Sequence, residues 1–372
     1  MSKTLGIGVI GCGNISAAYM RLAPMFAGIE MRACADMNME AAKARAEEFG
    51  LRAETVDGLL ASDDIDIVVN LTVPNAHHEV STRILNAGKH AYSEKPFVLS
   101  VEEGQSLKSL ADSKGLRVGS APDTFMGGAH QLARSLVDAG AVGKVTSGTC
   151  FVQSPGMEMW HPNPDFFFKP GGGPILDLGP YYVSNLVQLL GPVKRVVAMS
   201  SKGSDERTIT SEPRNGEKIT VETPTTIHAV LQFHSGAQVT YCASWDVWQH
   251  DHANMELYGE TGTLHVPDPN FFGGEVRMTN KDTFVNVPGW EHPLSVANDG
   301  PHANYRAAGL ADMAQAILED RPHRCSLEFS LHVVDVMTAI LISGEEGRFV
   351  EMTTNCERPA ALSPDAAQAL LA

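Results

Sequence analysis

The stretch LGIGVIGCGNIS, residues 5–16, decides the fold of the amino-terminal part of this chain. Its first six residues are apolar or glycine, which is typical of a strand buried in a parallel sheet. The next six have the spacing G-x-G-x-x-S and precede a helical pattern. Gly11 permits the tight turn, Gly13 lets a pyrophosphate approach the backbone, and Ser16 is small enough for the helix to pack on the strand. The stretch therefore predicts a strand–turn–helix unit that binds a dinucleotide.

The residues around this turn indicate which dinucleotide is bound. The helix that begins at Asn14 and Ile15 would hold the pyrophosphate at its N-terminus, because free N–H groups and the helix dipole favour an anion there. A second apolar strand, residues 31–35, ends at Asp36, about 25 residues after Gly11. An acid near this distance accepts a hydrogen bond from the ribose 2′-hydroxyl and repels a 2′-phosphate. No arginine follows immediately, so we expect NAD rather than NADP. The alternative is that Asp36 caps the next helix.

Strands and helices continue to alternate through the first third of the chain. A third apolar strand, residues 65–73, precedes a helix from about 78 to 87, and a short strand then runs into Glu94-Lys95-Pro96. Another helix, around 101–113, and another strand, 116–121, follow. This alternation predicts an α/β fold built on a doubly wound parallel sheet.

The composition restricts the function classes. With 372 residues the chain is long enough for two domains, and its formal net charge of −16 argues against non-specific binding to nucleic acid. Its six cysteines contain no C-x-x-C pair and are expected to be reduced and buried. We find no signal-peptide pattern and no apolar run of membrane-spanning length. A cytoplasmic protein that does not bind membranes is therefore expected.

The pattern changes after residue 145, where helices become sparse. Strand-like alternation appears in residues 227–233, 238–245, 255–258 and 263–266. We therefore expect an antiparallel or mixed sheet with one face on its helices and one face free for a partner subunit. Helical patterns return at residues 305–318 and 327–343.

Two domains follow from this change of pattern. The first is predicted over residues 1–123 and the second over residues 124–372, and the carboxyl-terminal helices of the second could pack back on the first. Residues 201–217 are polar and contain Gly203, Pro213 and Gly216, so they are expected to form a mobile excursion.

An aromatic segment, WHPNPDFFFKP at residues 160–170, runs into a triple glycine. Its prolines and glycines keep it out of regular structure. Its aromatic faces and polar groups suit a sugar, which needs both stacking and several hydrogen bonds. Trp160, His161 and Asp165 are therefore candidate substrate-binding residues.

The helix expected after Gly173 carries a second group of candidates. Asp177 and Tyr181 are one turn apart and share a face of that helix, so both could hydrogen-bond one substrate hydroxyl. The alternatives are that Asp177 caps the helix and that Tyr181 is a core aromatic whose hydroxyl has a partner.

Two histidine groups could ligate a metal. They are His77 with His78, and His250 with His252 inside WDVWQHDH, residues 245–252. Neither group has a further ligand at metal-binding spacing. We therefore expect no metal site, and we expect residues 245–252 to form a pocket wall or a surface loop.

The order of these motifs resembles the Gfo/Idh/MocA family, the glucose-fructose oxidoreductase and inositol dehydrogenase group. The shared features are the Gly11 turn, Thr72-Val73-Pro74-Asn75 with His78, Gly88-Lys89-His90, Glu94-Lys95-Pro96, and GGGPILDLGPY at residues 171–181. The resemblance covers nearly the whole chain. It implies an N-terminal Rossmann domain, a C-terminal α/β domain with a large open, mostly antiparallel sheet, and assembly into homodimers or homotetramers. It also implies hydride transfer between NAD and a sugar, glycoside or inositol-like polyol.

The resemblance further implies cofactor contacts at Thr72, Asn75 and His78, and it places Glu94 and Lys95 beside the nicotinamide. The positive charge of an oxidised nicotinamide favours the neutral amine of Lys95. That amine could then act as general acid/base on the substrate hydroxyl, which makes Lys95 a catalytic, cofactor-binding and substrate-binding candidate. The alternative is a solvated cation at a strand end.

Asp177 and Tyr181 would pass the hydroxyl proton on to solvent. The family commonly has histidine where Tyr181 stands, so Lys95 is expected to carry more of the acid–base work itself. Arg306 either reaches the same pocket or is an ordinary helix-surface charge.

Two other functions fit the same residues. In the first, NAD stays tightly bound and a transient oxidation of the sugar drives glycoside C3 oxidation, elimination, hydrolysis or isomerisation. In the second, the chain is a non-catalytic NAD-binding regulator. Lys95 together with Asp177 and Tyr181 argues against the regulator, because a sensor has no need of a proton relay.

Overall fold

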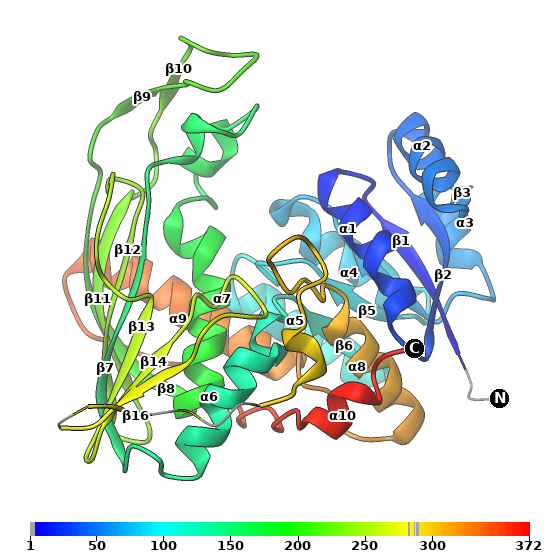
Figure 1. Cartoon of the computed structure of the whole chain (residues 1–372). Helices are drawn as coiled ribbons and strands as arrows, with labels where there is room; N and C mark the ends of the chain where they lie inside the picture. The colour runs from blue at the N-terminus through cyan, green and yellow to red at the C-terminus, as the bar shows by residue number, and fades with distance from the viewer. Residues whose placement is uncertain (1–3, 282, 286, 288–289) are drawn as a thin grey trace. The chain divides into compact units, whose positions relative to one another are not determined.

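The computed structural model describes residues 4–281, 283–285, 287 and 290–372, which fold into two compact units (Figure 1). The first unit comprises Met1–Gly128, Glu291–Leu331 and Pro359–Ala372. The second comprises Ala129–Trp290 and His332–Arg358. The first unit therefore contains residues 124–128 and two later segments that lie beyond the boundary expected at residue 123.

A six-stranded parallel sheet forms the centre of the first unit. Its strands are β1 (Leu5–Ile10), β2 (Ile29–Ala35), β3 (Arg52–Glu54), β4 (Ile67–Asn70), β5 (His90–Ser93) and β6 (Val118–Ser120). They lie in the order β3-β2-β1-β4-β5-β6, and every neighbouring pair is parallel. All residues of β1 and β4 are buried, as expected of strands covered on both faces. The doubly wound parallel sheet predicted from the sequence is confirmed.

Helices connect these strands. They are α1 (Asn14–Leu22), α2 (Met39–Phe49), α3 (Val56–Ala61), α4 (His77–Asn86) and α5 (Val101–Lys114), with short 3₁₀ turns η1 (Ala23–Met25), η2 (Pro74–Ala76) and η3 (Thr124–Met126). Polar side chains cap the N-termini of two of these helices. The side chain of Asn38 accepts a hydrogen bond from the Glu40 amide at the start of α2, and that of Ser100 accepts one from Glu103 at the start of α5.

Later parts of the chain complete the first unit with η6 (Pro293–Ser295), α8 (Ala308–Glu319) and α10 (Pro364–Gln368). The last residues pair with the segment after η1, where Phe26 and Leu371 form a bridge and the Ala27 amide donates to the Leu370 carbonyl (2.8 Å). Asp123 accepts from the amides of Ala307 (3.1 Å) and Gly309 (3.0 Å), so a buried carboxyl holds the start of α8.

A nine-stranded sheet forms the second unit. Its strands are β7 (Val145–Gln153), β8 (Val193–Ser201), β11 (Thr226–Phe233), β12 (Gln238–Ser244), β13 (Met255–Gly259), β14 (Thr263–Val266), β15 (Arg277–Thr279), β16 (Phe284–Val285) and β17 (Val350–Glu351). The order is β16-β15-β14-β13-β7-β12-β11-β8-β17, with β7 and β12 parallel and the other neighbours antiparallel. Buried and exposed residues alternate along β7 and β11, so one face of the sheet is covered. This confirms the predicted open, mostly antiparallel sheet.

Three longer helices accompany this sheet: α6 (Gly128–Asp138), α7 (Pro174–Leu190) and α9 (Leu327–Glu346). α7 contacts β7, β11 and β12, and almost all of its residues are buried. The segment between β7 and α7 contains two 3₁₀ turns, η4 (Met157–Met159) and η5 (Asp165–Phe168).

The helix α9 is long and apolar enough to cross a membrane by length and composition, with a mean hydropathy of 1.5 in its most apolar window. The expectation that no apolar run reaches membrane-spanning length is therefore wrong for this helix. However, 72% of that window is buried inside the structure, which is how the core helix of a soluble protein behaves. α9 is therefore only weak evidence that the chain crosses a membrane.

The polar segment expected to be a mobile excursion has regular structure. β9 (Glu206–Thr208) and β10 (Lys218–Thr220) pair as an antiparallel hairpin, which we call the arm, residues 206–220 (Figure 1). Apolar residues in and beside the arm enter a buried cluster made of Met157, Phe167, Phe168, Ile209, Ile219, Val221 and Trp245. A few apolar side chains among many polar ones are enough to anchor the hairpin. The average composition of the segment does not reveal them.

Candidate functional site

The glycine turn has the geometry that a bound pyrophosphate requires. Gly11 has a φ of +103°, and a Cβ there would lie 2.6 Å from the Leu71 carbonyl oxygen, so only glycine fits. Gly13 precedes α1 and makes no side-chain cap, while the space around its Cα is open. The Ser16 hydroxyl donates to the Gly13 carbonyl (2.6 Å) and so stabilises the turn from the buried side. No side chain caps the start of α1, at Asn14 and Ile15. Free N–H groups at a helix N-terminus can bind an anion.

Asp36 is attached to this turn. Its Oδ2 accepts from the Cys12 amide (2.7 Å), and its Oδ1 accepts from the Asn38 amide (2.8 Å). Because Asn38 caps α2, the alternative that Asp36 is the helix cap is wrong. Arg45 on α2 also reaches the turn, since its Nη2 lies 3.4 Å from the Gly13 carbonyl oxygen. Arg45 stands nine residues after Asp36, so the residues directly after Asp36 do not reveal it.

A buried asparagine organises the end of β4. Asn70 accepts from the Thr72 hydroxyl (2.6 Å) and donates to the His77 carbonyl (3.0 Å) and the Ser81 hydroxyl (3.1 Å). The Thr72 side chain is therefore held in one position at the carboxyl edge of the sheet. Asn75 lies exposed in η2.

The two adjacent histidines have different surroundings. His78 bonds through Nε2 to the Ser106 hydroxyl on α5 (2.7 Å). His77 is buried, and its ring joins two loops: Nδ1 lies 2.7 Å from the Pro96 carbonyl oxygen and Nε2 lies 3.0 Å from that of Thr72. Burial lowers the pKa of His77, while the two carbonyl acceptors oppose this effect. Sequence spacing directed attention to His78 and missed the bridging role of His77.

Glu94 is a buried carboxylate with three donors. Its Oε1 accepts from the Tyr19 hydroxyl (3.1 Å) and from Arg306 Nη1 (2.7 Å), and its Oε2 accepts from the Lys95 amide (2.9 Å). The guanidinium of Arg306 also lies 5.9 Å from the centre of the Tyr19 ring. Arg306 is thus an ion-pair partner of Glu94 rather than an ordinary helix-surface charge. Glu94 holds the backbone of Lys95 at the carboxyl end of β5.

In the second unit, Asp177 lies in the first turn of α7 and Tyr181 one turn later. The cap of α7 is Gly173, and the Asp177 amide donates to its carbonyl (3.1 Å), so Asp177 is not the helix cap. Tyr181 is buried with 5% of its surface exposed. The hydroxyl of the neighbouring Tyr182 donates a hydrogen bond to Asp268 (2.8 Å).

The aromatic segment is divided between core and surface. Trp160 is 65% exposed and Phe166 is 53% exposed, whereas Phe167 and Phe168 are buried. The His161 ring meets the edge of Trp160 at 5.4 Å between centroids. Asp165 is ion-paired with Arg214 of the arm, and this hydrogen bond holds the pKa of the Asp165 carboxyl below its usual value.

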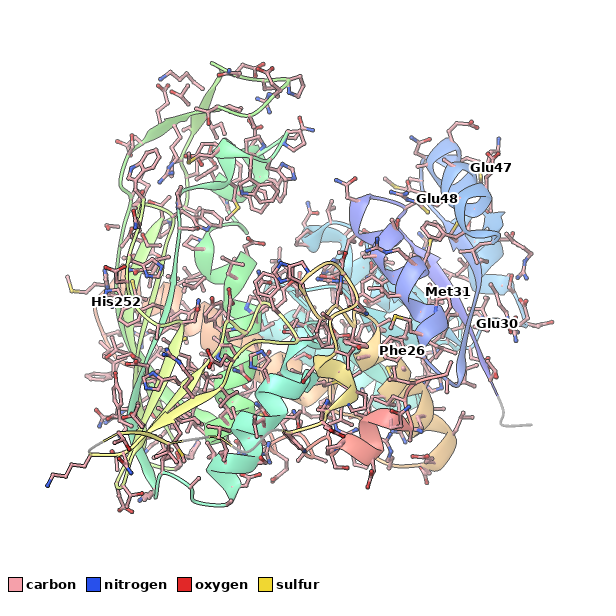
Figure 2. All side chains as sticks on the ribbon, in the orientation of Figure 1. Phe26, Glu30, Met31, Glu47, Glu48 and His252 are labelled. Carbon is pink, nitrogen blue, oxygen red and sulfur yellow. The ribbon has the colours of Figure 1, made fainter. Side chains whose placement is uncertain are left out.

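Lys95 and the proposed cofactor residues thus belong to the first unit, whereas Asp177, Tyr181 and the aromatic segment belong to the second. Over the described residues, no three His, Cys, Asp or Glu side chains gather closely enough to hold a metal ion. In the loop after β12, His252 stacks on Phe151 (4.2 Å between centroids), and Figure 2 shows it beside the strands of the second unit.

Comparison with known proteins gives two family matches. The family described as "Oxidoreductase family, NAD-binding Rossmann fold" matches residues 5–121, and "GFO/IDH/MocA C-terminal domain" matches residues 130–265. The first match spans all six strands of the parallel sheet, and the second spans the strands of the larger sheet from β7 to β14 but not β15, β16 and β17.

Individual relatives include a dTDP-3,4-didehydro-2,6-dideoxy-alpha-D-glucose 3-reductase of Streptomyces violaceoruber, 33% identical over 65% of this chain and 70% of the relative. A D-xylose 1-dehydrogenase (NADP(+)) of Haloferax volcanii is 26% identical over 93% of this chain and 99% of the relative. A levoglucosan dehydrogenase solved with NADH and L-sorbose superimposes with a TM-score of 0.80, at 22% identity, over 95% of this chain and 100% of that one. At that identity the structural match establishes the fold alone.

Proposed function

Because the chain belongs to the GFO/IDH/MocA family of NAD-binding oxidoreductases, we propose that it transfers a hydride between NAD and a secondary alcohol carbon of a sugar, glycoside or inositol-like polyol. The cofactor would bind within residues 1–123 and the substrate would contact residues of 124–372. We place the protein in the cytoplasm as a homodimer or homotetramer.

The observation that carries the proposal is the Glu94–Lys95 arrangement. A lysine that acts on a substrate must be presented in one orientation, and the buried Glu94 carboxylate fixes the Lys95 backbone through a 2.9 Å hydrogen bond. Tyr19 and Arg306 both donate to the other oxygen, Oε1, so Oε2 is the oxygen of Glu94 that could accept a further hydrogen bond.

The residues of the first unit fit NAD. Gly13 leaves the backbone accessible, and the uncapped start of α1 would hold the pyrophosphate. Asp36, which accepts from the Cys12 amide of the turn, would also accept from a ribose hydroxyl. Thr72, Asn75, His78 and Glu94 would complete the cofactor site. When bound, NAD supplies the acceptor or donor of the hydride.

The protein side of the reaction is proton transfer. The Lys95 amine would take the proton of the hydroxyl as its carbon is oxidised, and would return it in the reverse direction. Asp177 and Tyr181 would hydrogen-bond that hydroxyl and pass the proton on. Trp160, His161 and Asp165 would form part of the wall for the remainder of the sugar.

The test is a screen of NAD⁺ reduction across inositols, free sugars, anhydrosugars and glycosides, repeated with the Lys95→Ala variant. We expect Lys95→Ala to abolish turnover while NAD binding, measured by calorimetry, survives. The exposed Lys114→Ala variant is the matched control. Near wild-type turnover in Lys95→Ala overturns the assignment. NAD that remains bound through purification, with no net NADH formed, would instead indicate the transient-oxidation reaction.

A further inference from the structure

The turn that leads into α8 has an unusual backbone. Ala307 directly precedes the helix and has a φ of +87° and a ψ of +1°, in the left-handed region. A residue at this position usually has an extended backbone, and an alanine in the left-handed region is strained because its Cβ crowds the backbone. Among the described residues, the other non-glycine residue with a positive φ is Asp320, at the exposed C-terminal end of α8, where this conformation is common.

A carboxylate from a distant part of the chain supplies the cap that α8 lacks. Ala307 has no side chain that could accept a hydrogen bond from the first turn of the helix. Oδ2 of Asp123 takes that role, because it accepts from the amides of both Ala307 (3.1 Å) and Gly309 (3.0 Å). Asp123 is 2% exposed and Ala307 is 0% exposed, so these hydrogen bonds form away from solvent. The strained turn is therefore held from outside the helix, which is the condition under which strain persists.

The start of α8 is also packed tightly on β5, the strand that runs into Glu94 and Lys95. A Cβ at Gly309 would lie 2.4 Å from the Tyr92 hydroxyl oxygen and 3.0 Å from Asp123 Cβ, so a larger residue would displace buried side chains. Tyr92 is the third residue of β5. The position of the turn is therefore set by packing against β5 itself.

Arg306 joins this turn to Glu94. It directly precedes Ala307, and its Nη1 donates to Oε1 of Glu94 (2.7 Å), while Oε2 of Glu94 accepts from the Lys95 amide (2.9 Å). Burial raises the pKa of the Asp123 carboxyl, and the charge of Arg306 opposes this effect. The guanidinium is therefore within electrostatic reach of both carboxylates. Because Arg306 and Ala307 are adjacent, a change in the backbone angles of Ala307 would move the arginine relative to Glu94.

We infer that Asp123 and Ala307 are positioning residues for the Lys95 loop. Asp123 holds the left-handed turn, and the turn presents Arg306 to Glu94. The inference rests on the proposed function of Lys95. An ordinary cap residue with an extended backbone would start α8 without strain. A strained residue beside a buried ion pair is instead typical of sites where the position of a functional group is fixed.

The first measurement needs no substrate. Full-length protein is labelled briefly with acetic anhydride, and peptide mass spectrometry gives the labelling rate of the half-buried Lys95 relative to that of the exposed Lys114. In Asp123→Ala the turn loses its acceptor, so Arg306 should leave Glu94 and the Lys95 loop should open. We expect the ratio of Lys95 to Lys114 labelling to rise about threefold or more. Asp123→Asn should stay near the wild type, because its carbonyl oxygen can still accept from both amides.

A second comparison removes the strain instead of the acceptor. Glycine adopts a positive φ without a steric cost, so Ala307→Gly should lower the need for Asp123. We expect the double variant Asp123→Ala with Ala307→Gly to recover about half or more of the change in the labelling ratio, and Ala307→Gly alone to behave like the wild type. A general loss of packing at Asp123 would not be repaired at residue 307.

The same variants are then assayed with the sugar or polyol that reduces NAD⁺ best. Asp123→Ala should lower kcat about tenfold with KM little changed, because the amine is displaced, and the double variant should restore part of kcat. Asp57→Ala, which removes an exposed, arginine-paired acid of the same unit, is the matched control. If Asp123→Ala does not fold, Asp123→Ser replaces it, because the serine hydroxyl is one bond too short to hold both amides.

The inference is overturned if the labelling ratio in Asp123→Ala equals that of the wild type, or if Ala307→Gly repairs none of the change. A failure of the proposed function is a different result. In that case no sugar or polyol reduces NAD⁺, although the change in Lys95 labelling and its repair by Ala307→Gly are still measured.

Discussion

Arg306 donates a hydrogen bond to Glu94 over 2.7 Å, although 212 residues separate them in sequence. The Glu94 side chain is 8% exposed and that of Arg306 is 21% exposed, so the ion pair is largely shielded from water. The pair fixes the carboxylate that in turn holds the Lys95 amide. A residue just before α8 thereby helps to position the proposed catalytic loop after β5.

Removing the cation from this pair should destabilise the protein. Arg306→Met leaves the buried Glu94 carboxylate without its charge partner, and we expect a loss of about 3 kcal/mol in the free energy of unfolding, measured in urea. The double variant Arg306→Met with Glu94→Gln should recover part of the loss, because no unpaired charge remains. A single variant as stable as the wild type would show that the pair contributes nothing.

The bridge made by His77 should affect the catalytic rate more than substrate binding. His77→Phe keeps a ring of similar size but releases the carbonyls of Pro96 and Thr72, so the Lys95 loop loses one of its anchors. Because a displacement of about 1 Å can lower a rate roughly a hundredfold, we expect a strong fall in kcat with KM little changed. Glu79→Gln, on the exposed side of the same helix, is the control. An unchanged kcat contradicts the positioning role.

Asp36 should control the choice between NAD and NADP. Asp36→Ala removes the carboxylate that repels a 2′-phosphate and leaves Arg45 beside the turn. We expect the ratio of kcat/KM for NAD to that for NADP to fall about tenfold or more. Adding Arg45→Ala to this variant should reverse the gain with NADP. A wild-type enzyme that uses NADPH better than NADH would show that the inference about Asp36 is wrong.

Buried histidines should make the protein less stable in acid. Burial lowers the pKa of His130 to about 4, although the contact of Nε2 with the Phe271 carbonyl oxygen (2.8 Å) opposes this effect. Its Nδ1 lies 3.2 Å from the Asn185 amide nitrogen. The unfolded chain takes up this proton near pH 6.5, before the folded one does. The stabilising contribution is therefore complete above about pH 6.5 and is lost as the pH falls toward 4, with about 2 kcal/mol lost by pH 5.

Urea unfolding at pH 7, 6 and 5 measures this loss. The His130→Gln variant should be less stable at pH 7 but should show a smaller dependence on pH. His332, whose pKa burial also lowers to about 4, should contribute a further part of the slope. Equal unfolding free energies at the three pH values would contradict the prediction.

Much of the candidate site could be anticipated from the sequence, because its motifs are made of adjacent residues. The glycine turn, Asp36 and Glu94-Lys95-Pro96 follow directly after strands that the apolar pattern identifies, and parallel strands bring their carboxyl ends to one edge of the sheet. The roles of Tyr19, Asn70, His77 and Arg306 could not be anticipated in this way. Each acts through a partner on another element, and nothing in the neighbouring residues marks it.

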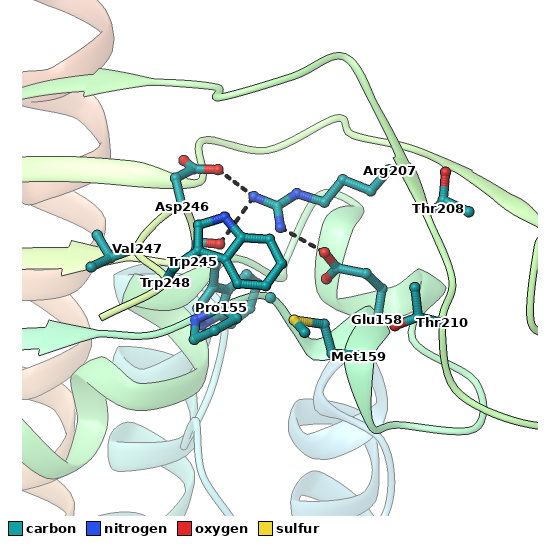
Figure 3. Close-up of a pocket in the computed structure, with 11 residues that line it drawn as sticks. Pro155, Glu158, Met159, Arg207, Thr208, Thr210, Trp245, Asp246, Val247 and Trp248 are labelled. Atoms are coloured by element: carbon teal, nitrogen blue, oxygen red, sulfur yellow. Dashed lines mark hydrogen bonds and ion pairs between the residues drawn. The ribbon is translucent and has the colours of Figure 1, made fainter. Parts of the chain in front are cut away.

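The arm shows the same limit in the second unit. Its average composition is polar, and two apolar side chains of the arm, Ile209 and Ile219, join Trp245 and Phe168 in a buried cluster. No motif in the sequence marks Arg207. In the folded chain it forms ion pairs with both Glu158 and Asp246 (Figure 3).

The sequence by itself determined the two sheets, the glycine turn and the lysine after β5, because strand and helix periodicity and turn chemistry are properties of adjacent residues. Only the tertiary structure decided which charges pair and which histidine bridges the loops. Those outcomes depend on packing between residues far apart in the chain. Burial there strengthens each electrostatic interaction and raises the energetic cost of each unpaired polar group.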